Sequence, residues 1–445
     1  MKIKRLIIKK LHKHYDYEVN FNDDITIIYG LNGSGKTTVL NILNMILSGN
    51  MYDLFDYSFK LIELEYSDAN NVLKKLRLTN NNKRANRTIT INDNGKEHNV
   101  NRGKVTLYGL FPEPSFESFE DMYPIIKSLK KRFNIIYLPL RRAYAEKKEK
   151  KVRGIPPIVI DSSEHEYEID PIKQVEELIK SKYSEIEYKI SLLNDEFRNN
   201  TIRLFSMQYA QEDFTSLKSL FENPDQIINR IQKIRNGYIK ILREFDLMTP
   251  LDVPKYSRYF NDVLDKVNNI YQYKHSNDAS IIFNLCLKLE LIYRLENVIE
   301  LADKLEEDKR EVRRTFTQFV TVINEFLGKS SDEEKSLVVE GNRQVYIRNK
   351  FEDHISLNTL SSGEQQILIL FTNLMFKLCD EPAVFIVDEP EMSLHLLWQR
   401  IFIDKIREVA PNVQIVFATH SPEIVSHYRN KMFKLSKNKV DDANE

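Results

Sequence analysis

The chain has 445 residues, more than one ordinary domain, so two structural units are expected. Lys plus Arg and Asp plus Glu both total 65, and this balance argues neither for nor against nucleic-acid binding, so any basic contact surface must be local. The N-terminus is interrupted by lysines and does not fit a signal peptide. No run reaches the roughly 18 apolar residues of a membrane span. These two features predict a cytoplasmic protein without membrane contact.

A glycine-rich turn follows the first buried-strand pattern. The β-branched run 25–29 predicts a strand, and it leads into Gly-Leu-Asn-Gly-Ser-Gly-Lys-Thr-Thr at 30–38 and then into a helix-like stretch. Strand, turn and helix in this order are the context that a phosphate-binding loop requires. Its backbone amides surround phosphates at the positive end of the following helix, where Lys36 contacts the β- and γ-phosphates and Thr37 binds Mg²⁺. The predicted nucleotide-binding residues are Gly30, Asn32, Gly33, Ser34, Gly35, Lys36, Thr37 and Thr38. This motif alone leaves ATP and GTP open.

Further along the chain, 135–139 predicts another strand, and Asn94-Gly95 predicts a hairpin turn. A basic segment follows the strand. It is either a DNA-phosphate contact or a solvated loop, and its charges are Arg141, Arg142, Lys147, Lys148, Lys150, Lys151 and Arg153.

A long segment poor in glycine predicts helices, because between Gly154 and Gly328 only Gly237 occurs. Apolar residues recur at steps of three and four from Ile172 to Phe197 and again from Leu285 to Phe326. Two such seams predict an antiparallel helical arm, and the breakers at 248–254 predict a turn in a small tip. The alternative is a helical bundle packed on the globular part. Cys286 and Cys379 lie in apolar stretches and are expected to be buried thiols.

The C-terminal part carries a second polar cluster. Leu-Ser-Ser-Gly-Glu-Gln-Gln at 360–366 precedes an apolar strand that ends in Asp388-Glu389, and a second strand, 413–418, ends at Thr419-His420. Polar residues at the carboxyl ends of parallel strands are where α/β sheets place their chemistry. Asp388 is therefore expected to bind Mg²⁺ and Glu389 to polarise the attacking water. His420 is expected to contact the γ-phosphate.

These motifs, in this order, resemble the ATP-binding-cassette (ABC) ATPases. The chain is similar to their SMC/Rad50/RecF and OLD-like branch over roughly 1–110 and 350–430, and Glu391-Met392-Ser393-Leu394-His395 followed by Trp398-Gln399 is typical of OLD-like and bacterial defence ATPases. The resemblance implies an α/β P-loop head formed by both chain ends, with an inserted helical or coiled-coil arm. It also implies ATP as the nucleotide, with Mg²⁺. The expected domains are 1–142 (N-terminal lobe), 143–335 (helical insert with a small tip) and 336–445 (C-terminal lobe).

By the same resemblance, two copies close over two ATP molecules, as a homodimer or within a higher oligomer. Ser361, Ser362 and Gly363 of one copy then contact the γ-phosphate bound to the other, and Glu364 is expected to belong to the same nucleotide-binding signature. Catalysis is expected from Lys36, Glu389 and His420. Family members also use a glutamine between the lobes, but no glutamine occurs between Lys36 and Gln174, so slow hydrolysis is expected.

The resemblance points to the stand-alone ATPase subunits of bacterial anti-phage systems, such as the Septu and PARIS types. In that interpretation the chain is an ATP-driven switch or sensor, and its partner is a separately encoded effector such as a nuclease. Two alternatives stay open. One is a DNA-repair ATPase of the RecF/Rad50 class that binds duplex DNA directly, and the other is a scaffold that binds ATP with little hydrolysis.

Overall fold

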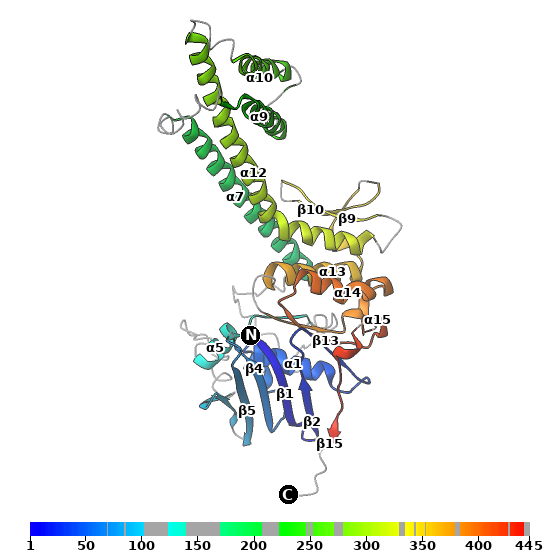
Figure 1. Cartoon of the computed structure of the whole chain (residues 1–445). Coiled ribbons are helices and arrows are strands. Elements are labelled where there is room, and N and C mark those ends of the chain that lie inside the picture. Colours follow the sequence, from blue (N-terminus) through cyan, green and yellow to red (C-terminus); the bar gives the residue numbers. More distant parts are fainter. Residues whose placement is uncertain are drawn as a thin grey trace, which may run out of the picture. The chain divides into compact units, whose positions relative to one another are not determined.

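A computed structural model describes residues 1–68, 70–83, 86–101, 123–138, 170–206, 222–245, 249, 252–270, 279–328, 334–341, 344–351, 353–378, 383–425 and 428–439. It contains two compact units (Figure 1). The head comprises Met1–Lys182 and Phe316–Glu445, and the helical unit comprises Tyr183–Thr315. The basic segment after residue 139 and Cys379 lie outside the described residues.

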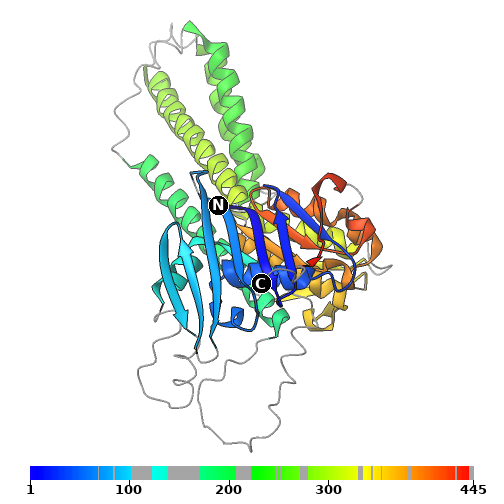
Figure 2. The same cartoon turned by 90° about the horizontal axis from the view of Figure 1, so that it is seen from below.

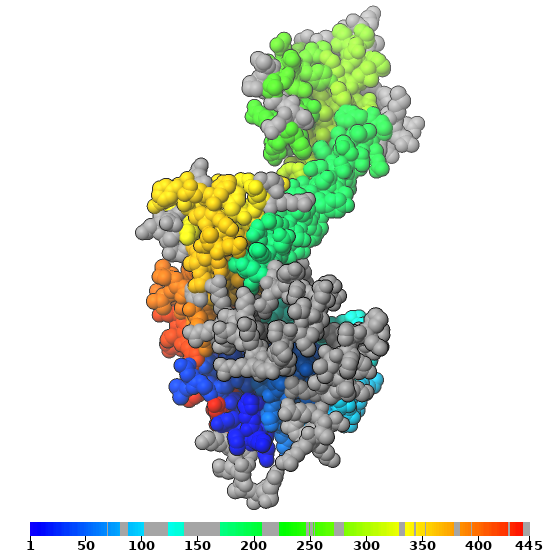
Figure 3. All heavy atoms as spheres, turned by 180° about the vertical axis from the view of Figure 1, so that it is seen from behind, coloured from blue at the N-terminus to red at the C-terminus, as the bar shows by residue number. Residues whose placement is uncertain are grey.

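A parallel sheet in the head joins strands from both ends of the chain. Its order is β14 (Met432–Lys434), β3 (Ile25–Tyr29), β13 (Gln414–Ala418), β12 (Val384–Asp388) and β8 (Ile135–Leu138), and every neighbouring pair is parallel. β12 and β13 are buried along their whole length, as their continuous apolar runs predict for a sheet covered on both faces. N-terminal residues in blue and C-terminal residues in orange and red accordingly lie side by side in the space-filling view (Figure 3). The expected P-loop head formed by both chain ends is therefore confirmed.

The second layer of the head is an antiparallel sheet, whose strands run side by side in blue and cyan (Figure 2). Asn94 and Gly95, at φ 51° and 92°, turn between its last two strands, which confirms the predicted hairpin. Its order is β15 (Asn438–Lys439), β2 (Tyr15–Asn20), β1 (Lys2–Leu11), β4 (Leu61–Ser67), β5 (Leu73–Lys83), β6 (Asn86–Asp93) and β7 (Lys96–Asn101).

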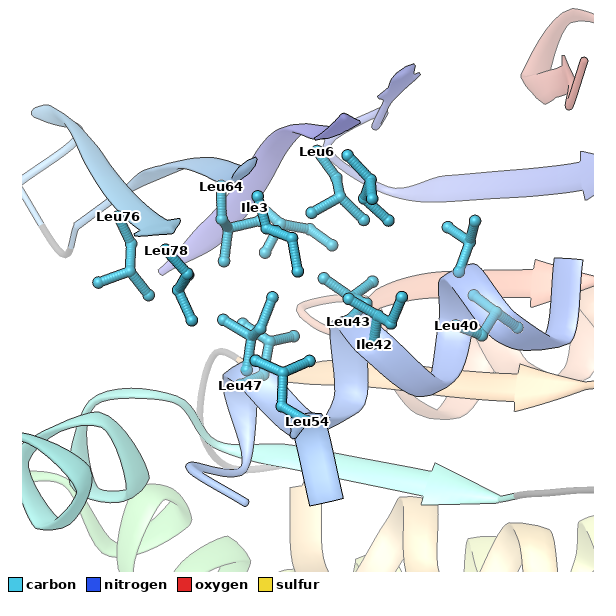
Figure 4. Packing of buried hydrophobic residues seen from close by; sticks show 14 of the residues in the cluster. Ile3, Leu6, Leu40, Ile42, Leu43, Leu47, Leu54, Leu64, Leu76 and Leu78 are labelled. Atoms are coloured by element: carbon cyan, nitrogen blue, oxygen red, sulfur yellow. The ribbon is translucent and has the colours of Figure 1, made fainter. Parts of the chain in front are cut away.

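Helix α1 (Lys36–Leu47) lies between the two sheets and is apolar on more than one face. Leu40, Leu43 and Leu47 of α1 lie opposite strand residues such as Leu6 and Leu64 (Figure 4). These side chains are fully buried, so α1 is held rigidly where it begins, at the phosphate loop. The short helices α2 (Met51–Leu54) and α5 (Pro124–Arg132) complete this side of the core.

The C-terminal part of the head adds helices around an aromatic cluster. Trp398 packs edge-on against Phe326, with ring centroids 6.0 Å apart, and Phe326 lies 5.2 Å from Phe371. The elements are α13 (Ser362–Asn373), which continues as π-helix at Leu374–Leu378, α14 (Leu396–Val409), α15 (Pro422–Val425), 3-10 turns at Leu357–Thr359, Pro390–Ser393 and Arg429–Lys431, and a small sheet of β9 (Ser336–Val339), β10 (Val345–Arg348) and β11 (His354–Ile355).

Both predicted helical seams lie in long helices, α7 (Pro171–Phe205) and α12 (Ala279–Gly328). Within the helical unit these helices are antiparallel neighbours, since Glu187 lies 3.6 Å from Arg313 while Asn200 and Leu301 line one cavity. Two further helices, α9 (Pro224–Glu244) and α10 (Val253–Asn268), form a hairpin around the predicted breakers and share an apolar core with α12. The insert thus combines the expected helix pair with a small bundle.

No helix among the described residues is long and apolar enough to cross a membrane. Cys286 is half-buried, and burial raises the pKa of its thiol.

Candidate functional site

The phosphate loop has the strand–turn–helix geometry that its sequence predicts. Gly33 and Gly35 have φ values of 75° and 97°, in the left-handed region that favours glycine. Gly35 also packs closely, because a Cβ atom there would lie 2.5 Å from the Tyr17 hydroxyl oxygen. Glycine at 35 is therefore favoured by the backbone conformation, and a side chain there would also have to displace the Tyr17 ring.

Lys36 projects from the first turn of α1 toward the C-terminal strands and is 5% exposed. Its Nζ donates to the Gly30 carbonyl at 3.2 Å and to His420 Nε2 at 2.5 Å. Burial lowers the pKa of Lys36, and the negative charges of Glu389, Asp388 and Glu391 oppose that shift. The structure thus joins two residues that lie 384 positions apart in the sequence.

A cavity of about 260 Å³ opens over this loop. Six of the eight predicted phosphate-loop residues line it together with Glu389 and His420, whereas Gly30 and Ser34 do not, and the six are Asn32, Gly33, Gly35, Lys36, Thr37 and Thr38. The β1–β2 hairpin and the C-terminal segment supply the remaining wall, with Leu11, His12, Tyr15, Tyr17 and Lys437. Phosphate-binding and carboxylate groups therefore share one concave site.

Asp388 ends strand β12 with its side chain buried at 2% exposure. Neither carboxylate oxygen accepts a hydrogen bond of normal geometry from a described residue, although the Thr37 hydroxyl is close enough to lower the pKa. Burial outweighs this effect and raises the pKa of Asp388 to about 6. A buried carboxylate without a donor, beside a hydroxyl, is a donor set that fits a hard divalent cation such as Mg²⁺.

Glu389 follows Asp388 in a strained conformation, with φ 46° in the left-handed region. Its N–H donates to the Ala418 carbonyl at 2.8 Å, which fixes the turn against β13. Its Oε1 lies 3.7 Å from His420 Nε2, and the side chain remains 22% exposed. The carboxylate is thus oriented into the cavity, where a water molecule can reach it.

Glu391, Gln399 and Ser421 support His420, a role that the sequence did not reveal. Glu391 Oε1 accepts a hydrogen bond from the His420 backbone N–H at 2.6 Å. The Ser421 hydroxyl donates to Gln399 Oε1 at 2.6 Å, and Gln399 Nε2 donates to the Leu394 carbonyl at 2.8 Å. Glu391 and Gln399 belong to the motif noted in the sequence, so their spacing was the available signal.

The signature residues lie elsewhere in the same chain, at the N-terminus of α13. Ser361 and Ser362 are exposed, whereas Gly363 and Glu364 are buried. None of the four is among the described residues that line the cavity over Lys36. One link to that cavity does exist, because Gln366 of α13 donates from Nε2 to the Pro390 carbonyl at 3.1 Å, beside Glu389.

The fold and the site together define a P-loop ATPase domain of the ABC type. A family model described as "AAA ATPase domain" matches residues 1–425, and the chain belongs to this family.

Two relatives match parts of the chain. The "Retron Vc95 probable ATPase" of Vibrio cholerae serotype O1 biovar El Tor is 22% identical over 236 residues, which cover 50% of this chain and 38% of that protein. The "Retron Ec83 probable ATPase" of Escherichia coli is 28% identical over 94 residues, which cover 19% of this chain and 17% of that protein. The chain thus spans well under two thirds of either relative.

Among solved structures, the chain is similar to the Smc head domain with an extended coiled coil from Pyrococcus furiosus. That likeness has a TM-score of 0.42 and 14% identity, and it covers 99% of this chain and 96% of the other. The SMC head domain from Thermotoga maritima gives a TM-score of 0.37 at 12% identity, over 99% of this chain and 98% of the other.

Proposed function

We propose that this chain is the ATP-binding and ATP-hydrolysing switch subunit of a bacterial anti-phage defence complex. It closes as a dimer over ATP and Mg²⁺ and controls a separately encoded effector such as a nuclease. The observation that carries the ATPase activity is the convergence of Lys36, Glu389 and His420 on one cavity, with the buried carboxylate of Asp388 close enough to Lys36 and Thr37 to interact with them.

Each residue has a defined task in ATP hydrolysis. Lys36 and the loop amides bind the β- and γ-phosphates. Thr37 and Asp388 would hold Mg²⁺, which would supply charge neutralisation at the phosphates. Glu389 accepts the proton of the attacking water. His420, held through its backbone by Glu391, presents Nε2 beside Lys36 and senses the γ-phosphate.

A dimer explains why Ser361 and Ser362 are exposed away from the cavity of their own chain. They stand at the positive end of α13, which attracts an anion that a second copy brings to it.

The defence role is supported by the family resemblance and by relatives named as probable retron ATPases. It predicts that the chain co-purifies with the product of an adjacent gene and that Lys36→Ala abolishes protection against phage. A repair ATPase would instead bind duplex DNA tightly at physiological salt without any partner protein.

The decisive test of the shared site is the mass of the assembly in solution. Glu389→Gln retains the shape of the side chain but cannot accept the proton, so it is expected to trap an ATP-bound dimer in light scattering after size exclusion. The matched control is Glu389→Gln combined with Lys36→Ala, which must stay monomeric. An unchanged mass of Glu389→Gln with ATP and Mg²⁺ would refute closure over nucleotide.

A further inference from the structure

The first turn of α13 is organised around the buried carboxylate of Glu364. Ser361 donates to Glu364 Oε2 twice, from its backbone N–H and from its hydroxyl, each at 2.8 Å. The Glu364 N–H in turn reaches the Ser361 hydroxyl oxygen at 3.4 Å, which completes a capping box. The first signature serine is therefore committed to capping its own helix.

Glu364 also forms an ion pair with Lys335, which stands just before strand β9. Lys335 Nζ lies 3.0 Å from Glu364 Oε1, and the two side chains are 18% and 4% exposed. Burial raises the pKa of Glu364, but the hydrogen bonds from Ser361 and the ion pair outweigh it, so the pKa is lowered and the group is ionised. Two residues beyond Lys335, the Leu337 N–H donates to Asn324 Oδ1 of α12 at 2.7 Å, which ties this strand to the end of the long helix.

A carboxylate at this place creates an electrostatic problem for a phosphate-binding helix end. The positive end of α13 attracts an anion, but an ionised Glu364 in the same turn repels it, and burial leaves this repulsion poorly screened. A positive charge in contact with Glu364 removes most of that repulsion.

We propose that Lys335 is a positioning residue of the shared ATP site. It neutralises Glu364, so that the exposed end of α13 can receive the γ-phosphate of ATP bound to a second copy of this chain. This inference rests on the proposed dimer and adds to it the residue that regulates closure.

The test compares the ATP concentration at which variants form dimers, all in the Glu389→Gln background so that ATP is not consumed. Lys335→Met is expected to raise this concentration at least tenfold, while binding of fluorescent ATP by the monomer stays unchanged because the Lys36 cavity is untouched. Adding Glu364→Gln to Lys335→Met is expected to restore dimerisation, since glutamine can still cap α13 but carries no charge. Lys173→Met removes an exposed head lysine and serves as the charge-matched control.

The single Glu364→Gln variant keeps the test decisive even if Lys335→Met folds poorly. In this variant Glu364 no longer offsets the positive charge of Lys335, so the variant is expected to dimerise at a lower ATP concentration than the Glu389→Gln protein. A higher concentration would overturn the charge argument, as would a Lys335→Met variant that closes normally or is not rescued by Glu364→Gln. Failure of the parent itself to dimerise would instead refute the proposed shared site.

Discussion

Replacing Asp388 by asparagine is expected to stabilise the nucleotide-free head while abolishing Mg²⁺-dependent ATP binding. The Asp388 carboxylate is buried, and its oxygens accept no hydrogen bond of normal geometry from a described residue. Such a group costs folding free energy that only a bound cation recovers. Asparagine keeps the shape of the side chain and removes the charge.

The size of the effect follows from the pKa of Asp388. The folded value of about 6 lies about 2 pH units above the ordinary value of 3.8. At about 1.4 kcal/mol per pH unit, the ionised carboxylate destabilises the head by about 3 kcal/mol at neutral pH, as an upper bound. The asparagine amide must find partners of its own, so the expected gain is about 1–3 kcal/mol.

The direction of the pH dependence is fixed by the same linkage. Between about pH 4 and pH 6 the folded protein binds more protons at this site than the unfolded chain does. The destabilisation is therefore fully present above the folded pKa and disappears as the pH falls below the unfolded value. Asp388→Asn should gain most near pH 8 and almost nothing near pH 3.

Urea unfolding followed by tryptophan fluorescence measures this difference in the head itself. Trp398 is the only tryptophan in the chain and is 3% exposed in the head core, so its emission does not report on the helical unit. With Mg²⁺ and ATP at about 100 times the dissociation constant, the wild type should gain about 2.7 kcal/mol and the variant should gain nothing.

Asp24→Asn is the matched control, because the same substitution there removes a paired carboxylate. Asp24 lies 2.8 Å from Lys431, and although burial opposes it, the hydrogen bond from Lys431 helps to lower the pKa of Asp24. This variant should be less stable than the wild type, with the loss largest above the ordinary pKa. An Asp388→Asn variant that gains nothing near pH 8, or gains equally at all pH values, would refute the reasoning.

Two further predictions concern the loop and the support of His420. Gly35→Ala places a Cβ atom 2.5 Å from the Tyr17 hydroxyl oxygen, on a residue with φ 97°. It should lower the free energy of unfolding by about 1–3 kcal/mol and weaken the binding of fluorescent ATP at least tenfold. Adding Tyr17→Phe should partly restore both. Glu391→Ala removes the acceptor of the His420 backbone N–H, so it should lower kcat about tenfold with little change in KM. Glu391→Gln keeps an acceptor oxygen, so its kcat should stay near that of the wild type. Equal effects of the two Glu391 variants would contradict a positioning role.

The core of the fold was predictable because its strands are continuous apolar runs. Four of the predicted runs supply adjacent strands of one parallel sheet, at 25–29, 135–138, 384–388 and 414–418. Their order in that sheet was not predicted, because the runs themselves contain no pairing information. The breakers at 248–254 likewise predicted a turn but could not show that the flanking helices pack on α12.

The candidate site was predictable in the identity of its residues but not in their energetics. Motifs identified Lys36, Asp388, Glu389 and His420 individually, and the structure brings them together across hundreds of residues. The pairing of Lys335 with Glu364 had no sequence signal, because no motif includes a lysine 29 positions before the glutamate. Such a pair forms only when tertiary folding brings two separate segments of the chain together.

Sequence motifs identify the acidic residues, but packing determines the pKa of each carboxyl group. Asp388 and Glu364 both have buried carboxyl groups near a helix end. Burial alone raises the pKa of each carboxyl group. Glu364 receives two donors and a lysine, so its pKa falls, whereas for Asp388 burial outweighs the lowering effects of Thr37 and Lys36, so its pKa stays raised. The Glu364 carboxylate is therefore stabilised by the chain itself and has a structural role. The Asp388 carboxylate depends on a bound cation instead. That dependence is what makes closure of the head responsive to ATP and Mg²⁺ in the proposed switch.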